Sequence, residues 1–303
     1  IDTMQNYVEN GGYPISGKEV FNHLLMRKGL AATRGEAVQL QNQMESSEIA
    51  DLLTNAALDD ILNAGYEKGN PELLNQHYGI TPVRSLSMIR DGVVFPKEAP
   101  IELFNSTDTY HSVPLMLGST QDEFSLWLIR DKDFVFKIAG VPLAPKNRER
   151  YALYNEYKSN AWTISAVDTI ATTITATAGH ENVYAYLFGW DDIPKIPPVD
   201  LPFLLGSAHG FDVPFVFGDY QTLGLGLLQS VLFNKTNEPS RVMLSDSVMS
   251  YWAEFAHSGQ PGKGRNSGEA VEWWPWDNSH HGMKKLILDI EKKGGIRMTT
   301  QSK

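Results

Sequence analysis

Two uninterrupted apolar runs, each followed by polar loop residues, constrain the fold of this chain more than any other feature. Val113–Leu117 leads into the polar turn Gly118–Asp122, and helical spacing of apolar residues resumes from Glu123. Val183–Phe188 is a second run, rich in aromatic and β-branched residues. Strands that are apolar on both faces are typical of a parallel sheet covered by helices. The sequence therefore predicts an α/β fold with functional groups near the strand ends.

Helical patterns surround these two runs. Apolar residues spaced by three and four in residues 16–66 predict small helices around one seam. Capping boxes at Ser16–Glu19 and Thr33–Glu36 predict two of the helix starts. The predicted seam consists of Val20, Phe21, Leu24, Leu25, Ile49, Leu52, Leu53, Leu58, Ile61 and Leu62.

The second half of the chain predicts two longer helices and one further strand. Residues 147–178 are compatible with a long helix, and residues 241–257 predict another. Leu286–Leu288 predicts a last strand after a tryptophan-rich segment. No internal repeat or linker marks a domain boundary.

The composition excludes several classes of protein. The formal net charge is −10, which argues against a nucleic-acid partner, because such proteins need a clustered positive field. The chain has no cysteine, so disulfide frameworks, cysteine nucleophiles and thiolate metal sites are excluded. No apolar run approaches the ~18 residues of a membrane span. We therefore expect no nucleic-acid partner and no membrane span, and the sequence assigns no cellular compartment.

Two segments that look like motifs are interpreted as coincidences. Gly12–Lys18 has the spacing of a phosphate-binding loop, but Glu19 stands where a hydroxyl must meet magnesium. His180-Glu181 begins like a zinc-protease motif, but Tyr184 stands where the second histidine is required. We therefore predict no metal site and no organic cofactor.

Glu123 and His209 are the candidate catalytic residues. Each lies in a loop after a predicted strand, and glycine and alanine flank His209, where packing does not demand an imidazole. An acid that orients an imidazole supplies two of the three members of a Ser–His–acid unit. The alternative interpretations are a structural histidine and an acid that caps a helix.

The third member of such a unit is a serine in a Gly-x-Ser-x-Gly turn. This pentapeptide does not occur in residues 1–303. When the chain order is serine, acid and histidine, an acid at 123 and a histidine at 209 place the serine upstream of Ile1. We therefore expect an upstream fragment that carries the nucleophile and packs against this chain.

Four ordered motifs give the chain a specific resemblance to a known family. They are the turn Asp91-Gly92, the strand and acid-bearing turn Val113–Glu123, the histidine loop His209–Gly218, and the helix Tyr251–Pro261 with the following Trp274-Pro275. In this order they resemble the type-B carboxylesterases, the group that includes cholinesterases and bacterial para-nitrobenzyl esterases. The resemblance runs from about residue 16 to 289 and corresponds to the second half of a family member.

This resemblance implies the carboxy-terminal portion of an α/β-hydrolase fold, with a mostly parallel sheet flanked by helices. Residues 1–303 are expected to form one domain portion. Within it, 1–80 is a helical segment, and 81–303 holds the acid and histidine strands and the carboxy-terminal helix. The glycine-rich oxyanion-hole loop and the serine turn of the family precede residue 1.

The resemblance also implies an activity, that of a serine carboxylesterase acting on small-molecule esters without a cofactor. Glu123 would be the triad acid and His209 the general base. Phe124 stands where the family commonly has glycine, and Asp212 stands where it has glutamate. Phe124, Trp127 and Phe211 are candidates for lining an apolar substrate site. The alternatives are an esterase-like binding or adhesion protein without catalysis, and an inactive truncated fragment.

Overall fold

The computed structural model describes residues 17–66, 92–221, 227–265, 270–290 and 293–303. The chain divides into two compact units, residues 1–100 and residues 101–303. That they form portions of one domain stays a prediction.

The first unit is built from four short helices. Their bounds are α2 Gly17–Arg27, α3 Arg34–Gln43, α4 Ser46–Thr54 and α5 Leu58–Tyr66. The predicted stripe of α2 is buried, with Leu24 and Leu25 fully enclosed, and Ile49, Leu52 and Ile61 pack against it. Leu53 and Leu58 were expected in this seam, but both side chains are exposed. Leu58 is 69% exposed because it is the first residue of α5, and Ile61 packs against the seam instead.

Helix α3 begins where its predicted cap lies. The Thr33 hydroxyl accepts the Glu36 N–H at 3.2 Å, and the Glu36 carboxylate accepts the backbone N–H of Ala32 instead of the N–H of Thr33. Arg34 in the first turn of α3 donates two hydrogen bonds to the buried carboxylate of Glu19 on α2. These contacts join the first two helices. The other predicted cap residue, Ser16, lies outside the described residues.

The second unit contains a four-stranded sheet in the order β1-β4-β5-β6. The strands are β1 Leu115–Thr120, β4 Val183–Phe188, β5 Lys285–Leu288 and β6 Arg297–Thr299. The first three are parallel, and β6 pairs with β5 in the antiparallel direction. The three predicted strands are therefore confirmed. The expectation that the strand at 286–288 is the last one is wrong, because β6 follows it.

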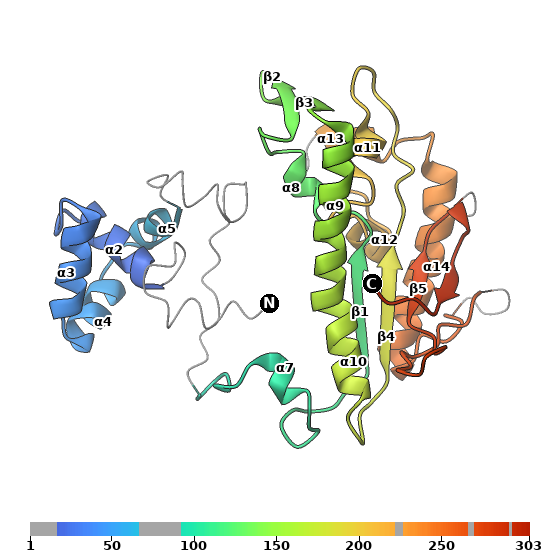
Figure 1. The fold of residues 1–303 in the computed structure, drawn as a ribbon, viewed down its shortest axis with the longest axis horizontal. Helices are drawn as coiled ribbons and strands as arrows, with labels where there is room; N and C mark the ends of the chain where they lie inside the picture. The colour runs from blue at the N-terminus through green and yellow to red at the C-terminus, as the bar shows by residue number, and fades with distance from the viewer. Residues whose placement is uncertain (1–16, 67–91, 222–226, 266–269, 291–292) are drawn as a thin grey trace. The chain divides into compact units, whose positions relative to one another are not determined.

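Helices cover both faces of this sheet, as Figure 1 shows for α9 and α14. The long predicted helix is α9 Arg148–Thr163, a π-helical turn η1 Ile164–Asp168, and α10 Thr169–Thr175. The second is α14 Glu238–Ser258, which packs on α12 Val213–Phe217. Side chains of β4 alternate between the two layers, because Val183 and Ala185 pack with η1 and α10, whereas Tyr184 and Phe188 pack with α14.

Shorter elements complete the second unit. Helix α8 Ser125–Leu128 follows the turn after β1, and a hairpin of β2 Val135–Ile138 and β3 Val141–Pro145 precedes α9. The remaining helices are α7 Pro100–Leu103, α11 Leu201–Leu205 and α13 Leu227–Leu232. Within the described residues, no helix has both the length and the apolar character needed to cross a bilayer.

A buried ion pair joins distant parts of the second unit. Lys285 Nζ on β5 lies 2.6 Å from Asp168 Oδ1 at the end of η1, and Asp168 Oδ2 accepts the backbone N–H of Lys303 at 2.6 Å. Burial lowers the pKa of Lys285, and the Asp168 carboxylate opposes that effect. The pair fixes the helical layer, the central sheet and the end of the chain to one another.

Candidate active site

Two loops meet at the carboxyl ends of β1 and β4. Glu123 lies in the turn directly after β1, and His209 lies in the loop after α11. The Asp122 N–H donates to the carbonyl of Ser207 at 3.1 Å, and Asp122 and Ala208 form an isolated parallel bridge. The Ser207 hydroxyl donates to the carbonyl of Phe188, the last residue of β4, at 2.8 Å. These hydrogen bonds hold both loops at the carboxyl ends of the strands.

Glu123 is a buried carboxylate with two hydrogen-bond partners. The residue is 4% exposed. Oε1 accepts the backbone N–H of Thr120 at 2.7 Å, and Oε2 lies 2.5 Å from Nδ1 of His209. A buried carboxylate needs such partners, because burial alone strongly disfavours the charged form. The two predicted catalytic side chains are therefore in direct contact.

Of the two ring nitrogens of His209, Nδ1 contacts Glu123 and Nε2 does not. Its hydrogen bond with Glu123 raises the pKa of His209, and burial partly opposes this effect. A carboxylate partner places the proton of the neutral imidazole on Nδ1, which leaves the Nε2 lone pair as an acceptor. Among the described residues, no protein group hydrogen-bonds Nε2, and the side chain remains 44% exposed. The imidazole is thus prepared to accept a proton at Nε2.

Four aromatic side chains gather beside the imidazole, and we call them the aromatic group: Phe124, Trp127, Tyr154 and Trp162. The centroids of Trp127 and Trp162 lie 4.9 and 5.4 Å from that of His209. Phe124 stacks on Trp127 at 5.8 Å and meets the edge of Tyr154 at 6.0 Å. Of the predicted lining residues, Trp127 therefore contacts the imidazole, and Phe124 contacts Trp127.

Sequence reasoning missed Tyr154 and Trp162. Both lie on α9, with Lys158 midway between them and its ammonium over the rings of Phe124 and Tyr154. The spacing of four residues places all three on one stripe of the helix. That stripe was visible in the sequence, but nothing in it indicated which loop the helix would face.

Phe211 does not join the aromatic group. It is 1% exposed and belongs to the hydrophobic core, where its ring lies 6.1 Å from that of Phe233. Among the described residues, its ring makes no ring contact with His209 or with a member of the aromatic group. We therefore leave Phe211 out of the aromatic group.

A second carboxylate lies close to the pair of Glu123 and His209. Burial raises the pKa of Asp212, while the Tyr186 hydroxyl donates to its Oδ2 at 2.8 Å. The charges of Glu123 and His209 act on this pKa in opposite directions. Gly118 makes room for Tyr186, because a Cβ there would lie 2.0 Å from the tyrosine ring.

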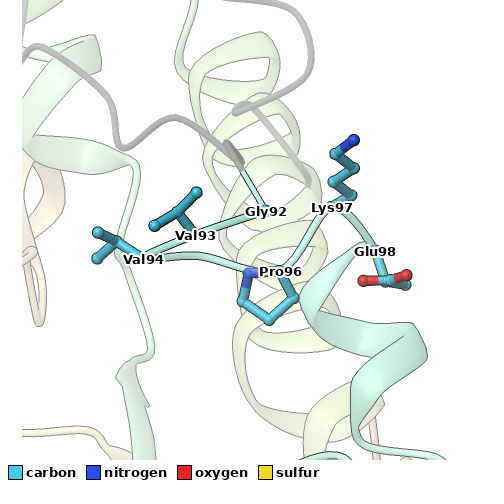
Figure 2. Close-up of a pocket in the computed structure, with 6 residues that line it drawn as sticks. All are labelled: Gly92, Val93, Val94, Pro96, Lys97 and Glu98. Carbon is cyan, nitrogen blue, oxygen red and sulfur yellow. The ribbon is translucent and has the colours of Figure 1, made fainter.

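Within the described ranges, no cluster of three histidine and carboxylate side chains has the arrangement of a metal site. Figure 2 shows a surface hollow in the first unit, lined by the single segment Gly92–Glu98. Its lining includes neither Glu123 nor His209, so we do not assign it to the site.

Solved structures define the fold. A para-nitrobenzyl esterase structure is 22% identical, with a TM-score of 0.53 over 84% of this chain and 48% of its own. A carboxylesterase of Geobacillus stearothermophilus is 18% identical, with a TM-score of 0.54 over 92% and 50%. The second unit's sheet and helices thus belong to the α/β-hydrolase fold, and the expected fold class is confirmed.

Sequence comparisons define the family. The profile of the Carboxylesterase family matches residues 141–302, so the chain belongs to that family, as its motifs predict. The para-nitrobenzyl esterase of Bacillus subtilis is 30% identical over 59% of this chain and 35% of its own length. Carboxylesterase 5A of Canis lupus familiaris is 23% identical over 89% and 49%. The chain spans half or less of the length of these relatives.

Proposed function

We propose that Glu123 and His209 are the acid and the base of a Ser–His–Glu unit that hydrolyses carboxylic esters. One observation carries this proposal, the 2.5 Å contact between a buried carboxylate and Nδ1 of a histidine whose Nε2 has no partner among the described residues. The names and family of the relatives support ester hydrolysis. The nucleophile in this proposal is a serine in a part of the protein that precedes Ile1.

In this mechanism His209 transfers one proton in each of the two half-reactions, from the serine to the leaving alcohol and then from water to the serine. The serine oxygen attacks the ester carbonyl while its proton passes to Nε2 of His209, and Glu123 stabilises the imidazolium that forms. Collapse of the tetrahedral intermediate transfers this proton to the leaving alcohol and leaves the acyl group on the serine. Water then attacks the acyl group, gives its proton to Nε2, and releases the acid. The serine recovers its proton from His209.

The aromatic group favours an ester with an apolar portion. Phe124 and Trp127 are proposed as substrate contacts, with Trp162 beside them. The ring of Trp127 contacts the imidazole, and the rings of Phe124 and Trp162 both contact Trp127. Apolar walls with a few directed polar groups are typical of small-molecule sites. Polar, charged esters are therefore expected to be poorer substrates than para-nitrophenyl esters of short and medium chain length.

Hydrolysis of para-nitrophenyl esters by the full protein tests the mechanism. His209→Ala is expected to reduce kcat on the order of 10⁴-fold, because the proton transfer loses its base. His280→Ala is the matched control, since His280 is exposed and lies outside the site. Serine-directed phosphonate should abolish turnover of the parent protein. Undiminished turnover in His209→Ala would remove this residue from the mechanism, and a folded parent protein without turnover would favour the binding-protein alternative.

We also propose that an upstream segment packs against the second unit. Several large apolar side chains of this unit are exposed, among them Ile138, Leu153 and Tyr157. Leu153 and Tyr157 lie one turn apart on α9, and a contiguous exposed apolar patch often marks a place where another part of a protein binds. Intact mass and tryptic peptides of an active sample test this proposal. Active protein without any peptide upstream of Ile1 would contradict it.

A further inference from the structure

The buried face of α9 is mostly polar, because three of its four buried residues are polar and only the ring of Tyr151 packs in the hydrophobic core. Four buried residues at intervals of four form this inner stripe: Tyr151, Asn155, Ser159 and Thr163. Each of them makes a hydrogen bond to a segment outside the helix. An ordinary helix of an α/β fold turns its apolar side chains inward. The inner stripe of α9 therefore has a role other than apolar packing.

Three of these four bonds reach the segment that carries Glu123. Thr163 Oγ1 lies 2.8 Å from the Ser119 hydroxyl near the end of β1. Ser159 Oγ accepts the backbone N–H of Phe124 at 3.0 Å, directly after Glu123. Asn155 Nδ2 donates to Asp122 Oδ1 at 2.7 Å, directly before Glu123. The helix thus holds the acid turn on both sides of the acid itself.

Asp122 connects this turn to the loop of His209. Its Oδ2 accepts the backbone N–H of Ser207 at 3.0 Å, and its own N–H donates to the Ser207 carbonyl at 3.1 Å. Ser207 stands two residues before His209. The side chain of Asp122 therefore bridges helix α9, through Asn155, and the histidine loop, through Ser207.

Gly206 shows how closely this bridge is packed. A Cβ at Gly206 would lie 2.3 Å from Asp122 Oδ2, and the backbone there has φ +52°. Both features require glycine, because a side chain would displace the carboxylate from the Ser207 N–H. The close approach of the Glu123 turn and the His209 loop therefore depends on the position of the Asp122 carboxylate.

We propose that Asp122 and Asn155 are positioning residues, which hold the Glu123 turn and the His209 loop in the register that allows the contact between Glu123 and His209. This inference rests on the proposed function of that pair. Neither residue touches the imidazole. Displacement of a catalytic group by about 1 Å can reduce a rate about 10²-fold, so losing the bridge should reduce kcat while leaving substrate binding largely intact.

Asn155→Leu tests the proposal, with Asn237→Leu as the matched control. Asn237 is also a buried asparagine of the second unit, and its amide bridges the carbonyls of Asp192 and Leu232, away from the site. In the full protein, Asn155→Leu should reduce kcat by roughly 10- to 100-fold with KM largely unchanged, whereas the control should keep the parent kcat.

A second readout does not depend on turnover. In protein labelled with ¹⁵N-histidine, NMR reports the pKa of His209 and the proton on its Nδ1. Asn155→Leu should move this pKa back toward the ordinary histidine value and accelerate exchange of that proton, because Glu123 no longer holds the ring. If the parent protein hydrolyses no ester, the proposed function fails, but this NMR comparison still decides the positioning role.

The exchange variant Asp122→Asn/Asn155→Asp supplies a rescue. The new amide can donate to the new carboxylate and still offer an oxygen to the Ser207 N–H, so kcat and the NMR signals should return toward parent values. If Asn155→Leu does not fold, Ser159→Ala takes its place, since it removes the acceptor of the Phe124 N–H and the hydroxyl that donates to Asn155 Oδ1 at 3.3 Å. Folded variants with an unchanged His209 pKa and proton exchange would overturn the proposal.

Discussion

His209 gains its distinctive chemistry from one neighbour. The carboxylate of Glu123 is buried by the turn after β1, and its hydrogen bond raises the pKa of His209. The charged imidazolium is therefore more stable here than in water. A base with a raised pKa accepts a proton more readily during the reaction. It also stays protonated, and so cannot act as a base, up to a higher pH.

The pH profile of ester hydrolysis follows from this pKa. In the proposed mechanism only neutral His209 accepts the serine proton, so kcat/KM should fall as the pH drops through a midpoint above the ordinary histidine value of about 6.5. Glu123→Gln removes the charge that raises the pKa, so the midpoint should move to lower pH while the rate also falls. The profile is measured with a para-nitrophenyl ester. A midpoint that does not respond to Glu123→Gln would contradict the assignment.

Asp289 offers a test of buried charge away from His209. Burial raises its pKa to about 6, so the folded protein holds this proton more tightly than the unfolded chain does. Its contribution to stability is then lost as the pH rises from about 4 to 6. Asp289→Asn keeps an acceptor for the Ile290 N–H and should be more stable than the parent above that range, with no gain near pH ~4.

Thermal unfolding at the two pH values measures this difference. Asp277→Asn is a control of opposite sign, because hydrogen bonds from Ser279 lower the pKa of Asp277. This second variant should lose stability, not gain it, at the higher pH. A destabilised Asp289→Asn at high pH would show that the carboxylate is favourable when charged.

At the residue scale, sequence reasoning located the acid and the histidine but not their surroundings. Glu123 and His209 were found because polar loop residues after apolar strands are conspicuous. Trp162 was missed because its neighbour in space comes from a loop 47 positions away, and no local pattern encodes that approach. Phe211 is buried in the hydrophobic core, a placement that no local pattern encoded, and its role as a lining residue stays a prediction.

The start of α9 can be tested separately from its inner stripe. Asn147 caps the helix, and its side chain accepts the backbone N–H of Arg150 at 2.8 Å. Asn147→Ala should reduce the free energy of unfolding by about 1 kcal/mol, because this N–H loses its partner. Asn147→Ser keeps an acceptor and should stay within a few tenths of the parent value. Equal losses in both variants, measured by urea unfolding, would contradict the cap.

At the element scale, strands that are apolar throughout were predictable and shorter ones were not. Val183–Phe188 was predicted with its observed bounds because every residue except Tyr186 is buried. β6 has three residues and an exposed arginine, so no run of apolar residues predicted its pairing with β5. The hairpin of β2 and β3 was missed for the same reason, since its side chains are mostly exposed.

The ion pair between Lys285 and Asp168 acts at the scale of the whole second unit. Lys285→Met leaves the buried Asp168 carboxylate without its cation and should cost about 3–5 kcal/mol. The double variant Lys285→Met/Asp168→Leu removes both charges and should lie much closer to the parent, because no unpaired charge remains. Urea unfolding of the second unit measures both. A double variant as unstable as the single one would show that the pair itself is strongly stabilising.

The sequence predicted the fold class of the molecule from a few ordered segments. Parallel strands, their polar ends and the long helices were sufficient to indicate a helix-covered sheet. The contact between loops 86 positions apart was predicted from their places after apolar strands and from the family motifs, whereas the bridge of Asp122, Asn155 and Ser207 was not predicted. Such a bridge depends on which face of α9 is turned toward the sheet. The sequence of α9 has no apolar stripe that would indicate this face.

The inward polar stripe of α9 makes this helix unusually intolerant of changes in length. Each residue advances an α-helix by about 100°, so deleting one position before Asn155 would swing that amide away from Asp122 and carry an outward-facing side chain into its place. The hairpin just before the helix has no comparable constraint, because its turn is exposed. Natural and engineered insertions should therefore accumulate in the hairpin and be absent from the helix.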